Sequence, residues 1–162
     1  MTSLEERVAA LEAEARVRAL FASYCSALDE GNGDRLGALF VPDACLVSGG
    51  RRIESRDAIV AYCRDAWERR DWARHIVGAV SHAGAGPTST AQAPLQFISR
   101  TGERTRISVG TYSATVAHGD GECRFVELTV SLEFDGPTDG HRWDSATHRG
   151  PAPVLLPGKD IS

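Results

Sequence analysis

Two polar side chains that could do chemistry lie at the end of the first amphipathic segment of this 162-residue chain. The stretch YCSALDEGNGD, residues 24 to 34, contains the phenol Tyr24 and the carboxylate Asp29. On a helix they would be separated by about 140° around the axis and about 7.5 Å along it, so both can flank a pocket. A buried phenol can donate a hydrogen bond to a substrate oxygen, and a carboxylate can orient a base. The same residues are also consistent with a core tyrosine and a solvated turn aspartate.

Composition restricts the class of protein. Hydrophobic residues make up 42% of the chain and charged residues 25%, with a formal net charge of −4, which is typical of one soluble domain. The chain has no Lys/Arg run and no apolar run long enough to cross a bilayer, so we expect neither nucleic acid nor a membrane as partner. The N-terminus lacks signal-peptide features and the four cysteines form no CxxC pair, which predicts a cytoplasmic protein with reduced thiols.

The spacing of apolar residues predicts three helices in the first part of the chain. The first begins after Ser3, where Glu6 completes a capping box. A short second helix is expected over 34–40, with Asp34 as its N-cap, and a third follows Ser55. Between the second and third helices, the Gly-Gly pair in ACLVSGGRRIES predicts a β-hairpin.

Beyond the third helix the apolar period changes to two. This predicts strands near 74–83, 89–100, 105–118 and 122–134. In the last strand the even positions from Val126 to Phe134 are apolar, which indicates a core face, whereas Pro94 predicts an edge or bulge in the second long strand. From residue 135 the chain is rich in Gly and Pro, so we expect a domain of residues 1–134 and a tail or lid of residues 135–162.

Three helices followed by a mostly antiparallel sheet make an α+β domain. Order and residues together resemble a SnoaL-like domain of the nuclear transport factor 2-like superfamily. The resemblance covers about residues 4–134 and is carried by YCSALDEGNGDRLGALFVPDA, ESRDAIVAYCRDA, RHIVGAV and VGTYSATVAHGDGECRFVELTV. The opening SLEERVAALEAEARVRAL is also similar to bile-acid 7α-dehydratases, and RHIVGAV to scytalone dehydratase. The resemblance implies a cone-shaped curved sheet wrapped around the three N-terminal helices, with a one-ended apolar pocket.

The resemblance carries three residues over as a catalytic set. Tyr24 and Asp29 match the family's pocket tyrosine and aspartate, and His75 matches the histidine that begins the first long strand. In this set His75 would remove a proton next to a carbonyl, Asp29 would orient the imidazole, and Tyr24 would donate to the developing oxyanion. The residues expected to bind substrate are Tyr62, Trp67, Phe97, Ser99 and Tyr112.

This set predicts a lyase, isomerase or cyclase that needs no cofactor and no metal. Its small-molecule substrate would be an apolar oxygenated metabolite, such as a polyketide or a steroid-like ring. In the dehydratases a further histidine or carboxylate comes from the next strand, whereas the region from Phe97 to Ser99 contains no base. The alternative is therefore a non-catalytic ligand-binding or accessory subunit, such as the β-subunit of a ring-hydroxylating dioxygenase. Under both hypotheses the open sheet face and the apolar RHIVGAV strand predict a homo-oligomer, either a dimer or a trimer.

Overall fold

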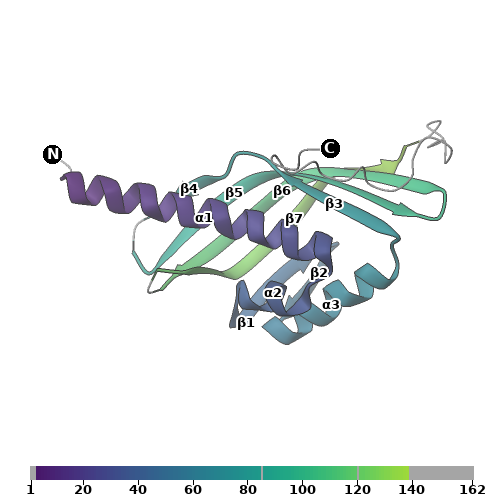
Figure 1. Cartoon of the computed structure of the whole chain (residues 1–162), viewed down its shortest axis with the longest axis horizontal. Coiled ribbons are helices and arrows are strands. Elements are labelled where there is room, and N and C mark those ends of the chain that lie inside the picture. Colours follow the sequence, from purple (N-terminus) through teal and green to yellow (C-terminus); the bar gives the residue numbers. More distant parts are fainter. Residues whose placement is uncertain (1–2, 85, 120, 139–162) are drawn as a thin grey trace, which may run out of the picture.

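The computed structural model describes residues 3–84, 86–119 and 121–138 of the chain. Helices come first along this part of the chain and long strands follow (Figure 1). The helices are α1 (Leu4–Glu30), α2 (Gly33–Ala38) and α3 (Arg56–Glu68). The strands are β1 (Phe40–Ser48), β2 (Arg51–Glu54), β3 (Trp72–Val77), β4 (Ser81–Ala83), β5 (Thr88–Thr101), β6 (Arg104–His118) and β7 (Cys123–Pro137).

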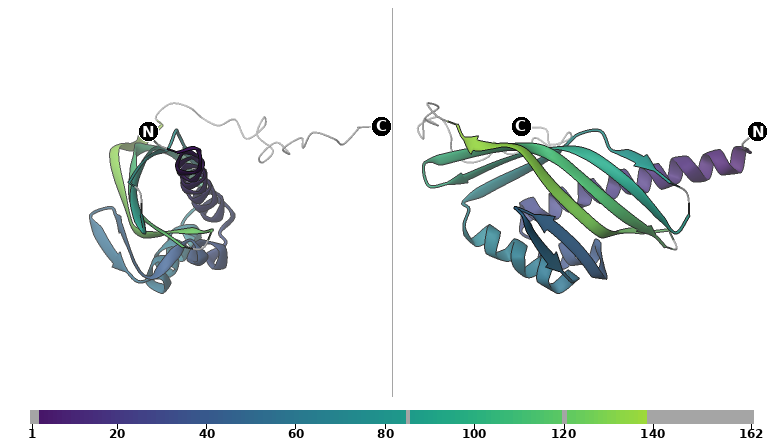
Figure 2. Two further views of the ribbon diagram at one scale, coloured as in Figure 1. Left: turned by 90° about the vertical axis from the view of Figure 1, so that its left-hand side faces the viewer. Right: turned by 180° about the vertical axis from the view of Figure 1, so that it is seen from behind.

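All seven strands join one sheet in the order β2-β1-β7-β6-β5-β3, with β4 pairing with β5 beside β3. The β1–β7 pair is parallel and the other pairs are antiparallel. The sheet curls strongly, and α1 covers its concave side (Figure 2). This arrangement confirms the α+β fold with a curved, mostly antiparallel sheet around the helices.

Both ends of α1 and the start of α3 follow the predicted capping groups. The Ser3 hydroxyl accepts from the Glu6 backbone N–H, and the Glu6 carboxylate accepts from the Ser3 N–H, which completes the capping box. Gly31, with φ of 65°, ends α1 in the left-handed conformation that favours glycine. Ser55 caps α3 by accepting from the backbone N–H of Ala58.

Five aromatic rings between α1 and the sheet form the centre of the core. The Tyr24 ring packs edge-on against three others, with centroid distances of 5.6 to 6.0 Å. Edge-to-face contacts of this kind hold a ring in one orientation. The last turns of α1 are therefore anchored firmly on the sheet. The rings belong to Phe21, Tyr24, Phe40, Tyr112 and Phe125.

The second helix begins and ends two residues earlier than the sequence predicted. Asn32, not Asp34, is its N-cap, because the Asn32 side chain accepts from the Arg35 N–H at 3.0 Å. Phe40 begins β1 and does not end the helix, because the preceding carbonyl of Leu39 accepts from the Phe125 N–H of β7. Pairing across the sheet therefore overrides the local helical pattern here.

The strand predicted over 74–83 is two strands, β3 and β4, interrupted near Gly78. Pro94 lies on β5 opposite this interruption, and its carbonyl accepts from the Gly78 N–H at 2.9 Å. Proline lacks the N–H that a neighbouring strand would need. The prediction of an edge or a bulge at Pro94 is therefore wrong, because β5 lies between β6 and the two strands β3 and β4 and keeps its register to β6 through Pro94. The proline is tolerated because it falls where β3 and β4 leave a gap in the pairing.

The core face predicted for the last strand is wrong in detail. Phe125 and Leu128 are fully buried, whereas Val126 is only partly buried. Leu132 and Phe134, also expected on the core face, are exposed. The β6–β7 pair has two register shifts, one between Thr115 and Val116 and one between Val109 and Gly110, which break the strict alternation of the two faces.

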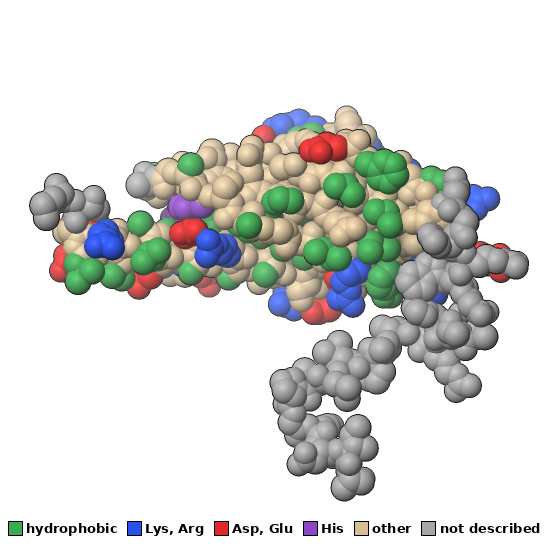
Figure 3. Space-filling view, turned by 90° about the horizontal axis from the view of Figure 1, so that it is seen from above, with side chains coloured by type: hydrophobic (Ala, Val, Ile, Leu, Met, Phe, Trp, Pro, Cys, Tyr) green, Lys and Arg blue, Asp and Glu red, His purple; other side chains and the backbone are tan. Residues whose placement is uncertain are grey.

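Strand β7 also continues past the domain boundary expected at residue 134. Asp135 remains in the strand because its carboxylate accepts from Arg106 and Ser108 of β6. Residues 139–162, and with them most of the expected tail or lid, lie outside the described residues. At the other end of the molecule, the first turns of α1 project past the sheet and expose apolar side chains among charged ones (Figure 3).

Candidate active site

The largest cavity of the described structure lies between the last turns of α1, α3 and the concave face of the sheet, and has a volume of about 840 Å³. Seven of the eight site residues predicted from the sequence line it, and the exception is Asp29. The helix α3 contributes its predicted apolar face, whereas the other residues come from α1 and from three strands. The seven residues are Tyr24, Tyr62, Trp67, His75, Phe97, Ser99 and Tyr112.

Asp29 lies behind His75 and holds it in place. The Asp29 Oδ1 and the His75 Nδ1 are 2.7 Å apart, and the same carboxylate accepts from the His75 backbone N–H at 2.9 and 3.2 Å. The two side chains are only 7% and 12% exposed. A carboxylate accepts hydrogen bonds, so the His75 Nδ1 carries the proton and Nε2 is left as the basic nitrogen.

The position of this pair follows from the packing of α1 on β3. Asp29 is in the last turn of α1, and β3 lies beside that turn. Arg74, the neighbour of His75, places its guanidinium 3.4 Å from the second carboxylate oxygen on the outer side. Asp29 and His75 both line a shallow outer hollow, but of the two only His75 also reaches the main cavity. Asp29 thus contacts the imidazole from outside the main cavity.

Two tyrosines in the cavity wall have hydroxyl groups whose pKa is raised by burial. Burial raises the pKa of the Tyr24 hydroxyl well above its ordinary value, with smaller contributions from Cys63, Cys25 and Tyr62. Burial also raises the pKa of Tyr112, whose ring packs edge-on against Tyr24 at 5.7 Å. A buried phenol that stays neutral can donate to an oxygen on which negative charge develops.

The buried thiols beside the cavity are poor nucleophiles. Burial raises the pKa of Cys25 to about 12 and that of Cys63 to about 11. The thiolate is the nucleophilic form of cysteine, and little of it is present near neutral pH at these values. The imidazole and the phenols are therefore the groups of this wall that could take part in acid–base chemistry.

The mouth of the cavity contains charged residues that were not predicted from the sequence. Four arginines and one carboxylate line it, although the whole chain has a net charge of −4. Arg106 and Asp135 form a two-pronged ion pair with both N–O distances at 2.6 Å. Arg69 and Arg70 follow α3, whereas Arg104 and Arg106 begin β6, so only the fold brings the four together. In the sequence, Arg69 and Arg70 form one short basic group and Arg104 and Arg106 another, and nothing in the sequence connects the two groups.

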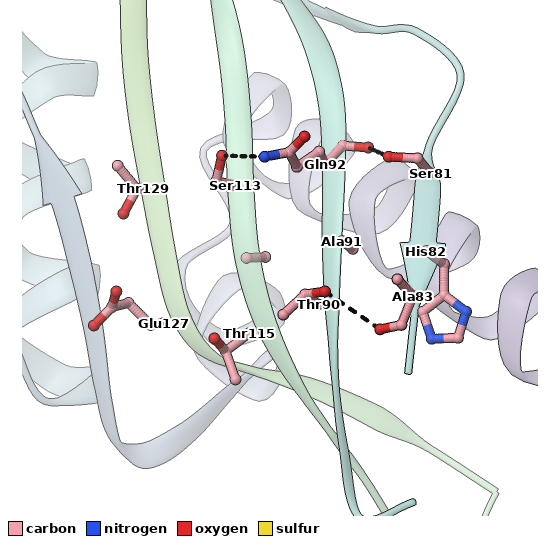
Figure 4. Close-up of a pocket in the computed structure, with 11 residues that line it drawn as sticks. Ser81, His82, Ala83, Thr90, Ala91, Gln92, Ser113, Thr115, Glu127 and Thr129 are labelled. Atoms are coloured by element: carbon pink, nitrogen blue, oxygen red, sulfur yellow. Dashed lines mark hydrogen bonds between the residues drawn. The ribbon is translucent and has the colours of Figure 1, made fainter. Parts of the chain in front are cut away.

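A second hollow, of about 350 Å³, lies on the sheet and is lined by small polar side chains of β4 to β7 (Figure 4). Ser113 alternates with the cavity-facing Tyr112, so its hydroxyl is on the outer face. The Gln92 amide donates to the Ser113 hydroxyl, and the Thr90 hydroxyl donates to the Ala83 carbonyl. These groups satisfy one another, and the hollow contains no acid–histidine pair.

Among residues 3–84, 86–119 and 121–138, no cluster of three or more His, Cys, Asp or Glu side chains could hold a metal ion. In the same part of the chain, no helix has both the length and the apolar character needed to cross a membrane.

Fold and site together define an α+β cone with a carboxylate-bound histidine in the wall of its cavity. The chain belongs to the SnoaL-like domain family, whose model matches residues 9–129. This confirms the resemblance drawn from the sequence. No curated protein sequence matches the chain significantly.

Several solved structures share the fold. One is the hexachlorocyclohexane dehydrochlorinase LinA-type3 from Novosphingobium barchaimii, with a TM-score of 0.77 and 15% identity over 85% of this chain and 97% of that chain. Another, from Novosphingobium aromaticivorans, is provisionally described as a scytalone dehydratase and has a TM-score of 0.71 and 17% identity over 79% of this chain and 89% of that chain.

A third similar structure is the β-subunit of a provisionally described aromatic-ring-hydroxylating dioxygenase from Novosphingobium aromaticivorans. It has a TM-score of 0.68 and 19% identity over 78% of this chain and 92% of that chain. At these identities the similarities establish a common fold and leave the reaction open.

Proposed function

We propose that this protein is a cofactor-independent lyase, isomerase or cyclase that removes a proton next to a carbonyl group. The observation that carries the proposal is the buried Asp29–His75 pair, whose histidine lines a large, mostly apolar cavity. The substrate in this proposal is an apolar oxygenated metabolite, such as a polyketide or a steroid-like ring. Two of the similar structures carry the names of eliminating enzymes, a dehydrochlorinase and a dehydratase, which supports this class of reaction.

In the proposed mechanism the His75 Nε2 takes the proton from the carbon beside the carbonyl. The imidazolium that forms is stabilised by the Asp29 carboxylate at 2.7 Å. The electron pair moves onto the carbonyl oxygen, where Tyr24 donates a hydrogen bond to the developing oxyanion. The enolate then collapses by expelling a β-substituent, by taking a proton at another carbon, or by attacking a second carbonyl.

The proposal is tested with a panel of β-hydroxy ketones and hydroxylated ring ketones. Solvent deuterium exchange next to the carbonyl reports proton removal even where no product is released. His75→Ala should lower turnover and exchange by about two decades or more. His82→Ala is the matched control, because His82 lies on β4 outside the cavity and should leave both rates unchanged. Wild-type rates in His75→Ala would reject His75 as the base.

A second candidate function is that of an accessory subunit. The strand beside β3 places Phe97 opposite His75 and Ser99 opposite Ala73, and neither residue is a base. The fold shared with a dioxygenase β-subunit is consistent with such a role. Co-purification with a larger iron–sulfur protein would favour this candidate, whereas turnover by the pure protein would exclude it.

We also propose that the protein is a cytoplasmic homo-oligomer. Ile76 on β3 is 47% exposed, and Leu132 and Phe134 on β7 are 46% and 56% exposed, so apolar surface on the sheet is left uncovered in one chain. All four thiols are free, as in a reducing compartment. Sedimentation velocity at micromolar concentration should show a dimer or a trimer, and a monomer would contradict the proposal.

A further inference from the structure

The mouth of the cavity has an unusual balance of charge. Its lining contains Arg69, Arg70, Arg104 and Arg106, and the only carboxylate there among the described residues is Asp135. Asp135 is already bound by Arg106 through two hydrogen bonds and also accepts from Ser108. The cations of this mouth therefore outnumber its acids, in a chain whose net charge is −4.

Arg70 is the most informative of these arginines. Its guanidinium carbon lies 4.8 Å from the centre of the Phe97 ring, and that ring lies 4.4 Å from the ring of His75. The two distances place the guanidinium within about 9 Å of the imidazole. This span is comparable with the length of a fused two-ring system.

Arg70 forms no direct ion pair with an acid of the described residues, and the one carboxylate that acts on its charge, Asp135, is itself bound by Arg106. Arg69, Arg70 and Arg104 form no ion pair with a carboxylate in residues 3–84, 86–119 and 121–138. Burial lowers the pKa of Arg70, and the neighbouring charge of Arg69 lowers it further. Clustered cations of this kind attract an anion, and guanidinium groups bind carboxylates and phosphates through paired N–H donors.

We propose that the substrate of this cavity carries an oxyanion, a carboxylate or a phosphate, which Arg70 binds together with Arg69 and Arg104. The apolar body of the same molecule then lies against Phe97 and extends inward toward Tyr24 and His75. This inference rests on the proposed function, since it names the substrate class of the same cavity. The arginine mouth fixes which end of the molecule faces the imidazole.

The test uses two fluorescent probes with the same aromatic body. Anilinonaphthalene sulfonate carries an anion, whereas N-phenylnaphthylamine is its uncharged counterpart. We expect the wild-type protein to bind the anionic probe about tenfold more tightly at low salt, and this preference to shrink as salt is added. Ala73→Trp, which fills the cavity, should abolish binding of both probes and so locate them there. Binding that survives Ala73→Trp would place the probes elsewhere and reject the inference.

Variants then assign the preference to the arginines. Arg70→Gln combined with Arg104→Gln should weaken the anionic probe by about tenfold or more and leave the neutral probe unchanged. Arg124→Gln is the control, because Arg124 is paired with Glu122 at the far end of β7 and should leave both affinities unchanged. Equal affinity of the two probes for the wild-type protein, or equal weakening of both by the double variant, would overturn the inference.

Competition separates the two anion classes. Displacement of the anionic probe by naphthoate indicates a carboxylate site, and displacement by naphthyl phosphate indicates a phosphate site. If neither compound displaces the probe, the inference is overturned. Asp29→Asn distinguishes this inference from the proposed function, because Asp29 does not line the main cavity. That variant should keep full binding of the anionic probe even where turnover is lost. Lost turnover with retained binding supports both proposals, whereas retained turnover with retained binding rejects only the acid–histidine mechanism.

Discussion

Replacing Asp29 by Asn removes the negative charge of the acid–histidine pair and keeps a side chain of the same size. The Asp29 Oδ1 accepts both the ring N–H and the backbone N–H of His75, at 2.7 and 2.9 Å. An asparagine keeps one carbonyl oxygen that can accept both bonds, and its amide nitrogen replaces Oδ2, which lies 3.2 Å from the backbone N–H and 3.4 Å from the half-exposed Arg74 guanidinium, so only these two longer contacts are lost. We therefore expect the imidazole to keep its orientation and the free energy of unfolding to fall by only about 1 kcal/mol.

The catalytic effect of the same change should be much larger. The proposed step creates an imidazolium beside the carboxylate, and with about 4 Å between charge centres and an effective dielectric constant of about 20 their attraction is about 4 kcal/mol. Loss of the whole attraction would slow the step by about three decades. The amide dipole of asparagine retains part of it, so we expect kcat to fall by about two to three decades.

The assay measures kcat on the best substrate of the ketone panel and thermal unfolding on the same samples. Glu30→Gln is the matched control, because Glu30 is the next residue of α1, is half exposed and is paired with Arg35 outside the cavity. That control should retain wild-type turnover. A folded Asp29→Asn protein whose kcat stays within about threefold of wild type would show that the carboxylate charge plays no part in the reaction.

Three other perturbations test the site and the fold. Tyr24→Phe removes the hydroxyl and leaves the ring in its edge-on contacts, so kcat should fall by about tenfold at an unchanged melting temperature, and full activity would exclude the phenol as donor. Gly110→Ala places a Cβ against the Ser131 carbonyl, closer than atoms can approach, so the free energy of unfolding in urea should drop by about 3 kcal/mol, and an unchanged midpoint would contradict the close approach of β7 at the register shift between Val109 and Gly110. Burial raises the pKa of Cys25 to about 12 and of Cys63 to about 11 from an ordinary 9, so iodoacetamide at a mildly alkaline pH should modify them far more slowly in the folded protein than in urea. Because the unfolded thiols ionise first, stability should also decrease as the pH rises above 9, and equal alkylation rates in both states would refute the burial of these thiols.

The ends of α1 and the start of α3 were predictable because their causes are local in the sequence. The Ser3 capping box and the Ser55 cap involve groups three residues apart. The face of α3 that lines the cavity, with Tyr62 and Trp67, follows from helical spacing alone. The positive φ angles of Gly49 and Gly50 in the β1–β2 turn likewise follow from the adjacent glycines.

The features that were missed depend on contacts between distant parts of the chain. A register shift between Thr115 and Val116 decides that Phe125 is buried in place of Val126, and no alternation rule reveals such a shift. The arginines of the cavity mouth come from α3 and β6, and each of them alone is typical of a solvated surface. The pairing of Asp29 with His75 spans 46 residues and was expected only through the family resemblance, and the roles of the two residues stay predictions.

Because neither Phe97 nor Ser99 is a base, the proposed enzyme has fewer ways to eliminate a leaving group, but elimination is still possible. One imidazole can serve twice, since the proton that His75 takes from carbon can be returned to a hydroxyl group leaving from the same face of the substrate. Both atoms must then reach a single nitrogen, which Asp29 holds in one orientation through the ring and the backbone of His75. Elimination in this cavity is therefore expected to proceed with the proton and the leaving group on one face, or with a leaving group that needs no proton.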